Sequence, residues 1–329
     1  MNRRFLASVC AVALGLGLNA AVAAEVTLKA ITAFPRTNLM NQPFHDLVEE
    51  LNAKGKGSIR IRYLGGPEVT PVQEQMGALQ RGVVDVYYGP SSYFDGQIPE
   101  VGAQNASNKT AMELRKDGGQ ALLNEAFNKR ANGQYLGYYG SGYTFHIYLK
   151  QKPKMLTNGM PDLTGVKVRG ATVYRPFYET LGINTVLVQF SEIHSALERG
   201  VIEGVGWTNL AITDGGWDKF LKYRIFPTYW QGDIALVMNH DAWKKLDAQQ
   251  QKLLTDLVVA SEAKAHEYFK TEVEKQSQKL KASGMQDIVL EGAAAKTYSR
   301  NAFQSLWDQL GKRISADEVA RYRKVFYSE

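Results

Sequence analysis

The residues best placed to do chemistry are an arginine and a set of aromatic side chains that follow strand-like runs. Arg169 ends the run VKVR, which alternates apolar and polar residues as a half-buried strand does. In open α/β sheets, ligands bind outside the carboxyl ends of the strands. An arginine at that edge, beside aromatic walls, would suit an anion with an apolar body. The aromatic residues in or after such runs are Tyr87, Tyr88, Tyr93, Phe94, Tyr143, Phe145, Trp207, Trp217, Tyr229 and Trp230.

These residues also have a purely structural interpretation. Several aromatic side chains could pack in the core, and Arg169 could pair with a surface carboxylate. The sequence lacks the signatures of common enzymes, such as H-E-x-x-H, G-x-S-x-G and G-x-x-x-x-G-K-[ST]. The sequence therefore favours binding over catalysis, without excluding an enzyme. The histidines are widely spaced and form no cluster in the sequence: His45, His146, His194, His240 and His266.

Strand-like and helical runs alternate on either side of these residues. EVTLKAITAF, SIRIRYLGG and VVDVYYG have the pattern of strands, and NQPFHDLVEELNAKG and TPVQEQMGALQRG between them have that of helices. A second set follows, with strands predicted at TGVKVRG, INTVLVQF and VIEGVGW and helices at VYRPFYETLG and SEIHSALERG. Alternation of this kind predicts an α/β fold with parallel strands.

One short phrase occurs twice, as ALQRGVVDV at 78–86 and as ALERGVIEG at 196–204, an offset of 118 residues (196 − 78 = 118). Each copy predicts the end of a helix, a glycine turn and the start of a parallel strand. The glycine supplies the left-handed turn, and the arginine before it favours the negative end of the helix. The repeat fits two paired α/β units, although such junctions also arise by chance in α/β proteins.

The C-terminal part has a different character. The stretch 241–284 contains neither glycine nor proline until Gly284, and AAAKTYSRNAFQSLWDQL and ISADEVARYRKVFYSE follow it. All of these predict helices, the first of them long. No linker, low-complexity segment or charge block separates the two α/β units. We therefore expect two lobes between which the chain crosses more than once.

The first 24 residues have the layout of a secretory signal peptide: Arg3 and Arg4, an apolar run, and small residues before Glu25. A retained membrane anchor is the alternative, but the run is short and glycine-rich and ends in an Ala-x-Ala pattern. The single cysteine, Cys10, lies in this leader. The mature chain then has no disulfide, thiol nucleophile or thiolate metal site. We expect an exported protein.

The remaining composition is that of a soluble globular protein. Without the two leader arginines, 37 basic residues (39 − 2) face 33 acidic ones, a net charge of +4. The basic residues are scattered and are not interleaved with aromatic side chains, so nucleic acid is not an expected partner. No other apolar run is long enough to span a bilayer.

Along nearly the whole mature chain, the sequence resembles the substrate-binding subunit of tripartite ATP-independent periplasmic (TRAP) transporters. The similar segments are GALQRGVVDVYYGPSSYFDGQIPE, DLTGVKVRG, LGINTVLVQFSEIHSALERGVIEGVGW and IALVMNHDAWKKL. Their combination in this order is specific, whereas each one alone is weak. The resemblance implies a two-lobed periplasmic binding protein of type II-like architecture. In that architecture two α/β domains are joined by crossing hinge strands, long helices lie in the C-terminal part, and the ligand lies between the lobes.

The resemblance also implies residue roles and a partner. It places at Arg169 the arginine that grips the substrate carboxylate through two parallel hydrogen bonds, a geometry that lysine does not reproduce. The partner is a membrane permease of small and large subunits, driven by an ion gradient. No catalytic residues are expected. The other expected ligand-binding residues are Trp207, Phe145, Tyr88, Tyr93, Ser91, Phe34, Thr208 and Asn209.

Three departures from the family pattern bear on the ligand. Many members carry a second arginine in the hinge region, where an ungapped match places Phe145. Members with a metal bridge tend to have an acidic residue before the tryptophan, whereas Gly206 precedes Trp207 here. Another branch has asparagine in place of that tryptophan. We therefore expect no metal or cofactor, and a monocarboxylate ligand with an apolar or aromatic tail.

The expected organisation is a signal peptide at 1–24, lobe I at 25–140 plus 232–260, and lobe II at 141–231 plus 261–329 with the C-terminal helices. Two other functions stay open. One is a secreted enzyme that acts on a small organic acid in a two-lobed cleft, and a buried carboxylate–His or Ser–His pair facing Arg169 would favour it. The other is a binding component of a different importer class, or a ligand sensor.

Overall fold

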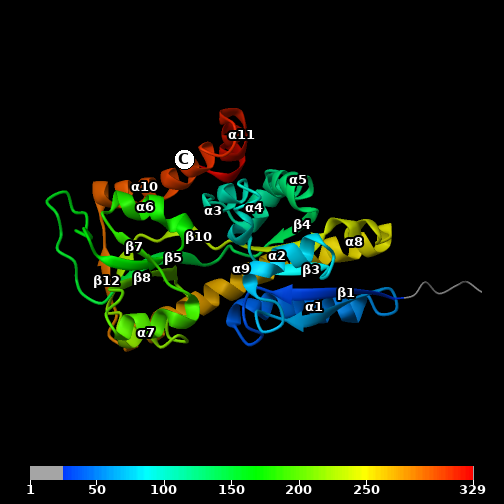
Figure 1. Cartoon of the computed structure of the whole chain (residues 1–329), viewed down its shortest axis with the longest axis horizontal. Coiled ribbons are helices and arrows are strands. Elements are labelled where there is room, and N and C mark those ends of the chain that lie inside the picture. The colour runs from blue at the N-terminus through cyan, green and yellow to red at the C-terminus, as the bar shows by residue number, and fades with distance from the viewer. Residues whose placement is uncertain (1–24, 329) are drawn as a thin grey trace, which may run out of the picture.

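A computed structural model describes residues 25–328 of the 329-residue chain, and its strands form two separate sheets (Figure 1). The predicted signal peptide lies outside the described residues. In the first sheet, β1 pairs in parallel with β2 and β3, and β11 runs antiparallel to β3 and β4. Its order is β2-β1-β3-β11-β4, with β1 at Val26–Thr32, β2 at Ile59–Gly65, β3 at Val86–Pro90, β4 at Gly133–Tyr138 and β11 at Ile234–Asn239.

The second sheet repeats this arrangement. β6 pairs in parallel with β7 and β8, and β5 runs antiparallel to β8, as β11 does to β3. Its path is β12-β9-β5-β8-β6-β7, with β10 also paired to β5. The bounds are β5 at Thr144–Leu149, β6 at Lys167–Gly170, β7 at Asn184–Leu187, β8 at Gly204–Thr208, β9 at Tyr223–Phe226, β10 at Tyr229–Gln231 and β12 at Gln286–Val289.

We call the first sheet with helices α1–α5 and α8 lobe I, and the second sheet with α6 and α7 lobe II. In Figure 1 lobe I lies on the right and lobe II on the left, so the two-lobed α/β architecture expected from the sequence is confirmed. The helices of the two lobes are α1 at Gln42–Lys54, α2 at Val72–Gln80, α3 at Val101–Asn105, α4 at Ala111–Lys116, α5 at Gly119–Ala131, α6 at Arg175–Thr180, α7 at Ile193–Glu198 and α8 at His240–Lys244.

The repeated phrase forms the same turn in both lobes. Gly82 follows α2 with a φ of 69°, and Gly200 follows α7 with a φ of 70°, so both lie in the left-handed region that favours glycine. The next residue, Val83 or Val201, donates its N–H to the carbonyl five residues earlier at 2.9 Å in each copy. The prediction of a helix end, a glycine turn and a parallel strand is therefore confirmed for both.

An acidic residue in each copy ties this turn to the neighbouring parallel strand. The N–H of Asp85 donates to the carbonyl of Lys29 at 2.8 Å, and the Asp85 carboxylate accepts the Lys29 N–H at 2.7 Å. Glu203 forms the same two bonds with Lys167, at 2.7 and 3.1 Å. The carboxylate thus accepts a strand N–H that the backbone of the turn does not reach, and it extends the hydrogen bonding between the two parallel strands by one bond.

Two short segments cross between the lobes, one from β4 to β5 and one from β10 to β11. They are bonded to each other, because Tyr139 donates its N–H to the Ile234 carbonyl at 2.7 Å. Glycine lets them approach closely. A Cβ on Gly140 would lie 2.2 Å from the carbonyl oxygen of Gly232, and one on Gly232 would lie 1.9 Å from the ring of Tyr143. These segments are the hinge strands that the sequence predicted.

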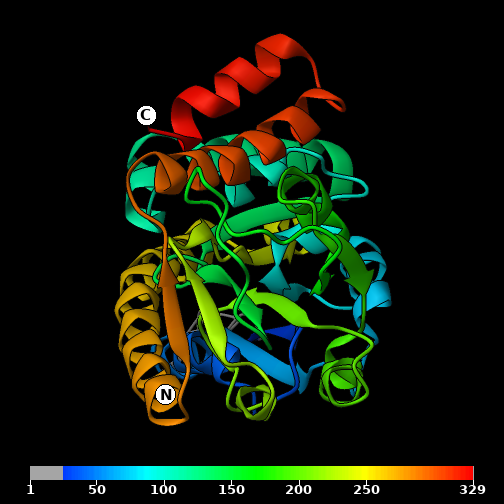
Figure 2. The ribbon, with the colours of Figure 1, turned by 90° about the vertical axis from the view of Figure 1, so that its left-hand side faces the viewer.

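A third crossing is made by the long helix α9, Ala248–Ala282, which Figure 2 shows in gold along one edge of the molecule. Leu254 and Val258 pack in the core of lobe I, whereas Leu280 packs in a core of lobe II. The expected boundary at residue 260 falls inside this continuous helix, so its placement stays a prediction. Among the described residues, we find no helix with both the length and the apolar character needed to cross a bilayer.

The sequence assigned the C-terminal helices to lobe II, but they contact both lobes. α10, Gly292–Gly311, packs against α6 and β10 on one side and α3 on the other, and α11, Ala316–Phe326, packs against α3 and α5. The reason is an apolar face on α11: Tyr322 and Phe326 are buried, and the Tyr322 hydroxyl donates to the Leu122 carbonyl at 3.1 Å.

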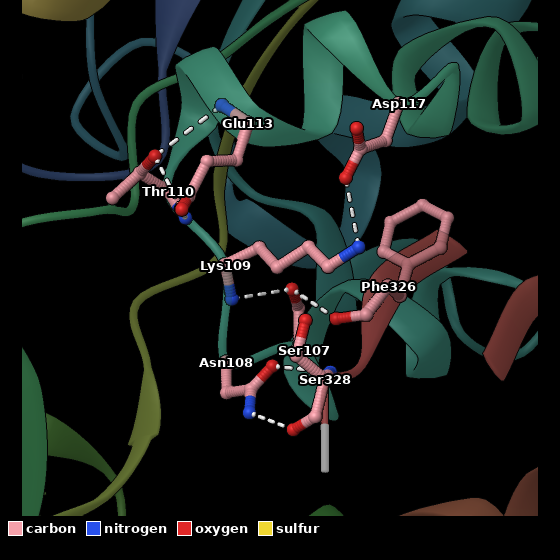
Figure 3. A network of polar contacts seen from close by, with 8 residues as sticks. All are labelled: Ser107, Asn108, Lys109, Thr110, Glu113, Asp117, Phe326 and Ser328. Atoms are coloured by element: carbon pink, nitrogen blue, oxygen red, sulfur yellow. Dashed lines mark hydrogen bonds and ion pairs between the residues drawn. The ribbon is translucent and has the colours of Figure 1, made fainter. Parts of the chain in front are cut away.

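The last residues are fixed to the loop between α3 and α4 (Figure 3). The Ser107 hydroxyl donates to the carbonyl of Phe326 at 2.7 Å, and the Asn108 side chain exchanges two hydrogen bonds with the backbone of Ser328. Lys109 in the same loop accepts a hydrogen bond from the Gln231 side chain on the hinge at 3.1 Å. The C-terminus, this loop and the hinge therefore form one connected network.

Candidate functional site

A cavity of about 800 Å³ lies between the two lobes. It opens at the carboxyl ends of parallel strands, β1 and β3 in lobe I and β6 and β8 in lobe II, where α/β folds place their ligands. The hinge closes its floor. The lining includes 33–35 after β1, 92–94 after β3, 169–174 from the end of β6, 187–191 from the end of β7, 207–208 in β8, and 230, 231 and 233 at the hinge.

Arg169 lines this cavity from β6, a strand paired on both sides. Its Nε donates to the Val188 carbonyl at 3.1 Å, and its guanidinium carbon lies 4.8 Å from the ring centroid of Trp207. These two contacts orient the guanidinium plane. Within residues 25–328 its terminal nitrogens form neither a hydrogen bond nor an ion pair. The side chain thus presents two parallel donors, the geometry that a carboxylate accepts.

Trp207 belongs to an aromatic stack beside the guanidinium. Its ring centroid lies 5.5 Å from that of Phe190, with 31° between the planes, and 5.2 Å from that of Trp217, which it meets edge to face. Trp217 is buried and anchors the stack, whereas Phe190 is exposed and lines the cavity. Sequence reasoning missed Phe190, the last residue of the predicted strand INTVLVQF, which lies beyond the end of β7 in the structure.

Phe145 forms a second aromatic wall. It pairs with Thr208 across β5 and β8, which places both residues at the cavity. The Phe145 ring meets Tyr174 edge to face at 5.6 Å and Trp230 at 6.4 Å, and both of those rings also line the cavity. Where an ungapped match to the family predicted an arginine, this chain therefore has an apolar surface.

Lobe I contributes Phe34 and Tyr93 to the opposite side. Tyr93 is 48% exposed because it borders the open cavity, yet protein surrounds its ring closely enough that burial raises the pKa of the hydroxyl. The charge of Asp233 raises that pKa further, and the charge of Arg169 lowers it. The Tyr93 hydroxyl is thus neutral at physiological pH and can donate or accept a hydrogen bond.

Three residues predicted to bind ligand do not line the cavity. Tyr88 is buried in lobe I, stacked 5.1 Å from Phe44, because successive residues of a strand point to opposite faces and its neighbour Tyr87 takes the cavity side. Ser91 is fully buried, and Ser92 lines the cavity instead.

The third, Asn209, is turned toward the backbone of the hinge. Its carbonyl oxygen accepts the Thr144 N–H and its amide donates to the Thr144 hydroxyl, both at 3.1 Å. Asn209 therefore shapes the start of β5 and does not face the ligand space. The other six predicted residues do line the cavity: Arg169, Trp207, Phe145, Tyr93, Phe34 and Thr208.

Asp233, which sequence reasoning also missed, is a carboxylate at the cavity floor with only 7% of its surface exposed. The Ser92 N–H donates to its Oδ2 at 2.9 Å. Burial raises the pKa of the carboxyl group, while the donors of Ser92 and Asn105 act in the opposite direction. The sequence offers one signal for it, an acidic residue directly before the apolar hinge strand IALVMN.

Among the described residues, neither a carboxylate–His pair nor a Ser–His pair faces Arg169 in the cavity, and such a pair would have favoured an enzyme. None of the five histidines is among its lining residues in the described chain. His146, the histidine nearest the hinge in sequence, is buried, and its Nδ1 lies 2.8 Å from the Ile225 carbonyl. Burial lowers the pKa of His146 to about 3, so this ring is neutral.

The position that the family uses for an acidic metal ligand is sterically restricted. A Cβ on Gly206 would lie 1.6 Å from the hydroxyl oxygen of Tyr178, which is hydrogen-bonded to the Tyr229 hydroxyl at 2.8 Å. No acidic side chain fits there without displacing that pair. Over residues 25–328, no three histidine, cysteine or acidic side chains come together as a metal site. The absence of a metal in the bound state stays a prediction.

Solved structures share this fold over almost their whole length. An extracytoplasmic solute receptor of Bordetella pertussis that binds pyroglutamic acid matches with a TM-score of 0.77 and 17% identity, over 92% of this chain and 99% of that one. A TRAP periplasmic solute-binding protein of Pseudomonas putida F1 with bound D-glucuronate matches with a TM-score of 0.73 and 21% identity, over 90% and 96%. The fold is thus that of TRAP solute-binding proteins, and the resemblance drawn from the sequence is confirmed.

The sequence comparisons identify the family. Residues 31–313 match the model of bacterial extracellular solute-binding protein, family 7, and the chain belongs to this family. The C4-dicarboxylate-binding periplasmic protein of Rhodobacter capsulatus is 22% identical over 337 aligned positions, 97% of each chain. The monocarboxylate 2-oxoacid-binding periplasmic protein of Nostoc is 24% identical over 215 positions, 62% of this chain and 57% of that relative's length.

Proposed function

We propose that this protein captures a small organic monocarboxylate in the cavity between its lobes, in the periplasm, and delivers it to a TRAP-type permease of small and large membrane subunits. The observation that carries the proposal is Arg169. Its Nε is hydrogen-bonded to the Val188 carbonyl and its guanidinium group lies over the Trp207 ring, while its two terminal nitrogens are unpaired in the described chain. A guanidinium fixed in this way is preorganised for a carboxylate, so little further ordering is needed on binding.

The cavity walls support the second half of the proposal, an apolar or aromatic tail. Phe190 and Trp207 flank the guanidinium on one side, and Phe145, Tyr174 and Trp230 form another wall. Aromatic faces of this kind bury apolar surface and prefer offset or edge-to-face contact with another ring. The Bordetella receptor binds pyroglutamic acid and the Pseudomonas protein holds D-glucuronate, both of which are organic acids.

The test begins with mass spectrometry of the small molecules that co-purify with the protein, followed by calorimetric titration of the acid found. Arg169→Ala leaves the bound carboxylate unpaired, which costs on the order of 2–5 kcal/mol. That corresponds to a roughly thirtyfold or greater loss of affinity. Arg169→Lys is expected to restore it only in part, because a point charge does not reproduce the fork.

A matched control is Arg175→Ala, which removes an exposed arginine from the first position of α6. It should bind as the unmodified protein does. A melting curve for each variant separates binding from folding. Wild-type affinity in Arg169→Ala, combined with a normal melting curve, would contradict the proposed role of this residue.

A further inference from the structure

The cavity carries two opposite charges. Of the side chains that line it in the described chain, only Arg169 and Asp233 are ionisable to a formal charge near neutral pH. Arg169 comes from the second sheet, and Asp233 lies in the hinge segment directly before β11. A ligand that contributes a carboxylate alone would satisfy the arginine and leave the aspartate without a counter-charge. A buried charge without a partner is costly, so the second charge requires an explanation.

Asp233 is held in place by the protein but is not neutralised by it. The Ser91 N–H donates to its carbonyl at 2.8 Å and the Ser92 N–H donates to its carboxylate at 2.9 Å, which fixes both its backbone and its side chain. Within residues 25–328, no lysine, arginine or histidine forms an ion pair with it. The rigid and unpaired carboxylate at a cavity wall has the geometry of a binding group rather than of a structural ion pair.

A second, independent observation concerns the polar groups around Asp233. Asn105 also lines the cavity and is only 7% exposed, and its Oδ1 has no hydrogen-bond partner in the described chain. Buried polar atoms are normally paired, so the Asn105 amide oxygen is a second acceptor in the cavity lining that lacks a donor.

The two charges act on the same small volume. The hydroxyl groups of Tyr93 and Tyr174 both respond to them: the charge of Arg169 lowers the pKa of each, and that of Asp233 raises it. These tyrosines belong to opposite lobes and both line the cavity. Arg169 and Asp233 therefore line one cavity together with these two tyrosines, and both charges act on the same hydroxyl groups.

We infer that the ligand is an amino acid in the broad sense, a carboxylate that also carries an ammonium group, with the carboxylate at Arg169 and the ammonium at Asp233 and Asn105. This inference rests on the proposed function and specifies its substrate class. An ammonium has three donors, which can be shared among the Asp233 carboxylate, the Asn105 amide oxygen and a tyrosine hydroxyl. The aromatic walls then enclose the carbon chain between the two charged ends.

The experiment compares acids with their amino counterparts, using the mature protein freed of bound ligand by unfolding and refolding. Suitable pairs are 3-phenylpropanoate with phenylalanine, butanoate with 4-aminobutanoate, and pentanoate with 5-aminopentanoate. In at least one pair, the amino compound should bind roughly tenfold or more tightly, the gain expected from one charge-assisted hydrogen bond. Asp233→Asn should abolish this preference for the amino compound.

Asp256→Asn is the matched control, since it removes an exposed aspartate on α9 that pairs with Lys252 and is not among the residues that line the cavity. It should keep the preference for the amino compound. Equal or weaker binding of the amino compound in every pair would overturn the inference, and so would a preference that survives in Asp233→Asn. If that variant does not fold, the comparison within the unmodified protein decides. A co-purified ligand without a basic nitrogen would also overturn it.

The proposed function fails in a different way. If Arg169→Ala binds every acid and amino acid as the unmodified protein does, the carboxylate site itself is wrong. If Arg169→Ala loses all of them while Asp233→Asn changes nothing, the carboxylate site is correct and only the ammonium site is wrong.

Discussion

The two lobes are built on one plan and differ at the positions that face the cavity. The turns at Gly82 and Gly200 have the same φ to within a degree, and Asp85 and Glu203 form the same pair of bonds to the adjacent strand. Lys29 in lobe I and Lys167 in lobe II, the partners in these bonds, are therefore equivalent positions. Two residues further along each strand, Ile31 is equivalent to Arg169. The position that holds the guanidinium in lobe II thus holds an apolar side chain in lobe I.

The hinge segments also contain a pair of equivalent positions, and here the charged residue is negative and belongs to lobe I. The Ser91 N–H donates to the carbonyl of Asp233, and the Asn209 N–H donates to that of Thr144, both at 2.8 Å. Asp233 and Thr144 are therefore counterparts. Each lobe thus supplies one charge, and the matching place in the other lobe is uncharged. The shared backbone bonds keep the scaffold constant, which leaves the side chains at the strand ends free to differ and to define the ligand.

The largest effect expected from this comparison is at the Ile31 and Arg169 pair. Ile31 is 0% exposed in the core of lobe I, so Ile31→Ala should lower the free energy of unfolding by about 2–5 kcal/mol and leave ligand affinity of the folded protein near its original value. Arg169→Ala should do the reverse, with affinity lost and stability kept. Urea unfolding and calorimetric titration of both variants measure the two effects. A stability loss in Arg169→Ala as large as that in Ile31→Ala would show that the counterparts share a structural role.

The sequence was enough to predict the place of Arg169 at a strand end and the glycine turns of both lobes, because each depends only on neighbouring residues. Arg169 ends a run with a clear strand alternation, and the glycine turns need only a helix end and a left-handed residue. Tyr88 shows the limit of that approach. In VVDVYYG two adjacent tyrosines lie in one buried strand, and which of them faces the cavity depends on register, which a one-residue shift reverses.

Asp233 shows a second limit, one that comes from tertiary packing. In the segment QGDIAL it has the sequence environment of an ordinary loop aspartate before a strand. It is buried only because the two hinge segments lie against each other at Gly140 and Gly232, residues about 90 positions apart in the chain. No local pattern contains that contact. The same holds for Asn105, which lies in the short helix α3 that packs against α10, a helix about 190 positions later in the chain.

The second largest effect is expected at the equivalent positions Asp233 and Thr144, and it concerns how the free energy of unfolding depends on pH. Burial raises the pKa of Asp233 above its usual 3.8, so the folded protein holds this proton more tightly than the unfolded chain does. The protonated carboxyl group therefore adds to the free energy of unfolding at low pH, and this contribution is lost as the pH rises through the folded-state pKa. In the ligand-free protein, Asp233→Asn should therefore be more stable at pH 7, by on the order of 1 kcal/mol. The gain should shrink toward zero as the pH falls below about 3.8.

Thr144→Val is the control for this titration, since it changes the counterpart without removing a charge, and its effect on stability should not vary over the same pH range. Thermal melts of the three proteins between pH 3 and pH 7 supply the measurement. The tyrosines around Asp233 stay neutral over this range, because burial raises the pKa of Tyr87, Tyr138 and Tyr143. A lower stability of Asp233→Asn at pH 7 would mean that the donors of Ser92 and Asn105 outweigh the cost of burial.

The smallest effect tests the shared scaffold itself. An L-residue at Gly82 or Gly200 must adopt the left-handed conformation, and neither site is crowded: the nearest atoms to a Cβ on Gly82 lie 3.9 Å away, and none lies within 4 Å at Gly200. Gly82→Ala and Gly200→Ala should therefore each lower the free energy of unfolding by about 1 kcal/mol, from conformational strain alone. Since the sites lie in different lobes, the double variant should show the sum of the two losses.

Gly96→Ala provides the reference for these two substitutions, because its backbone is not left-handed and a Cβ there meets no atom within 4 Å. It should change stability little. Equal losses at Gly82 and Gly200, measured by urea unfolding, would support a common turn with one energetic role in both lobes. A loss at one site that exceeds the other severalfold would show that the turns share a shape but not a function in folding, and that the lobes differ in their scaffold as well as in their charges.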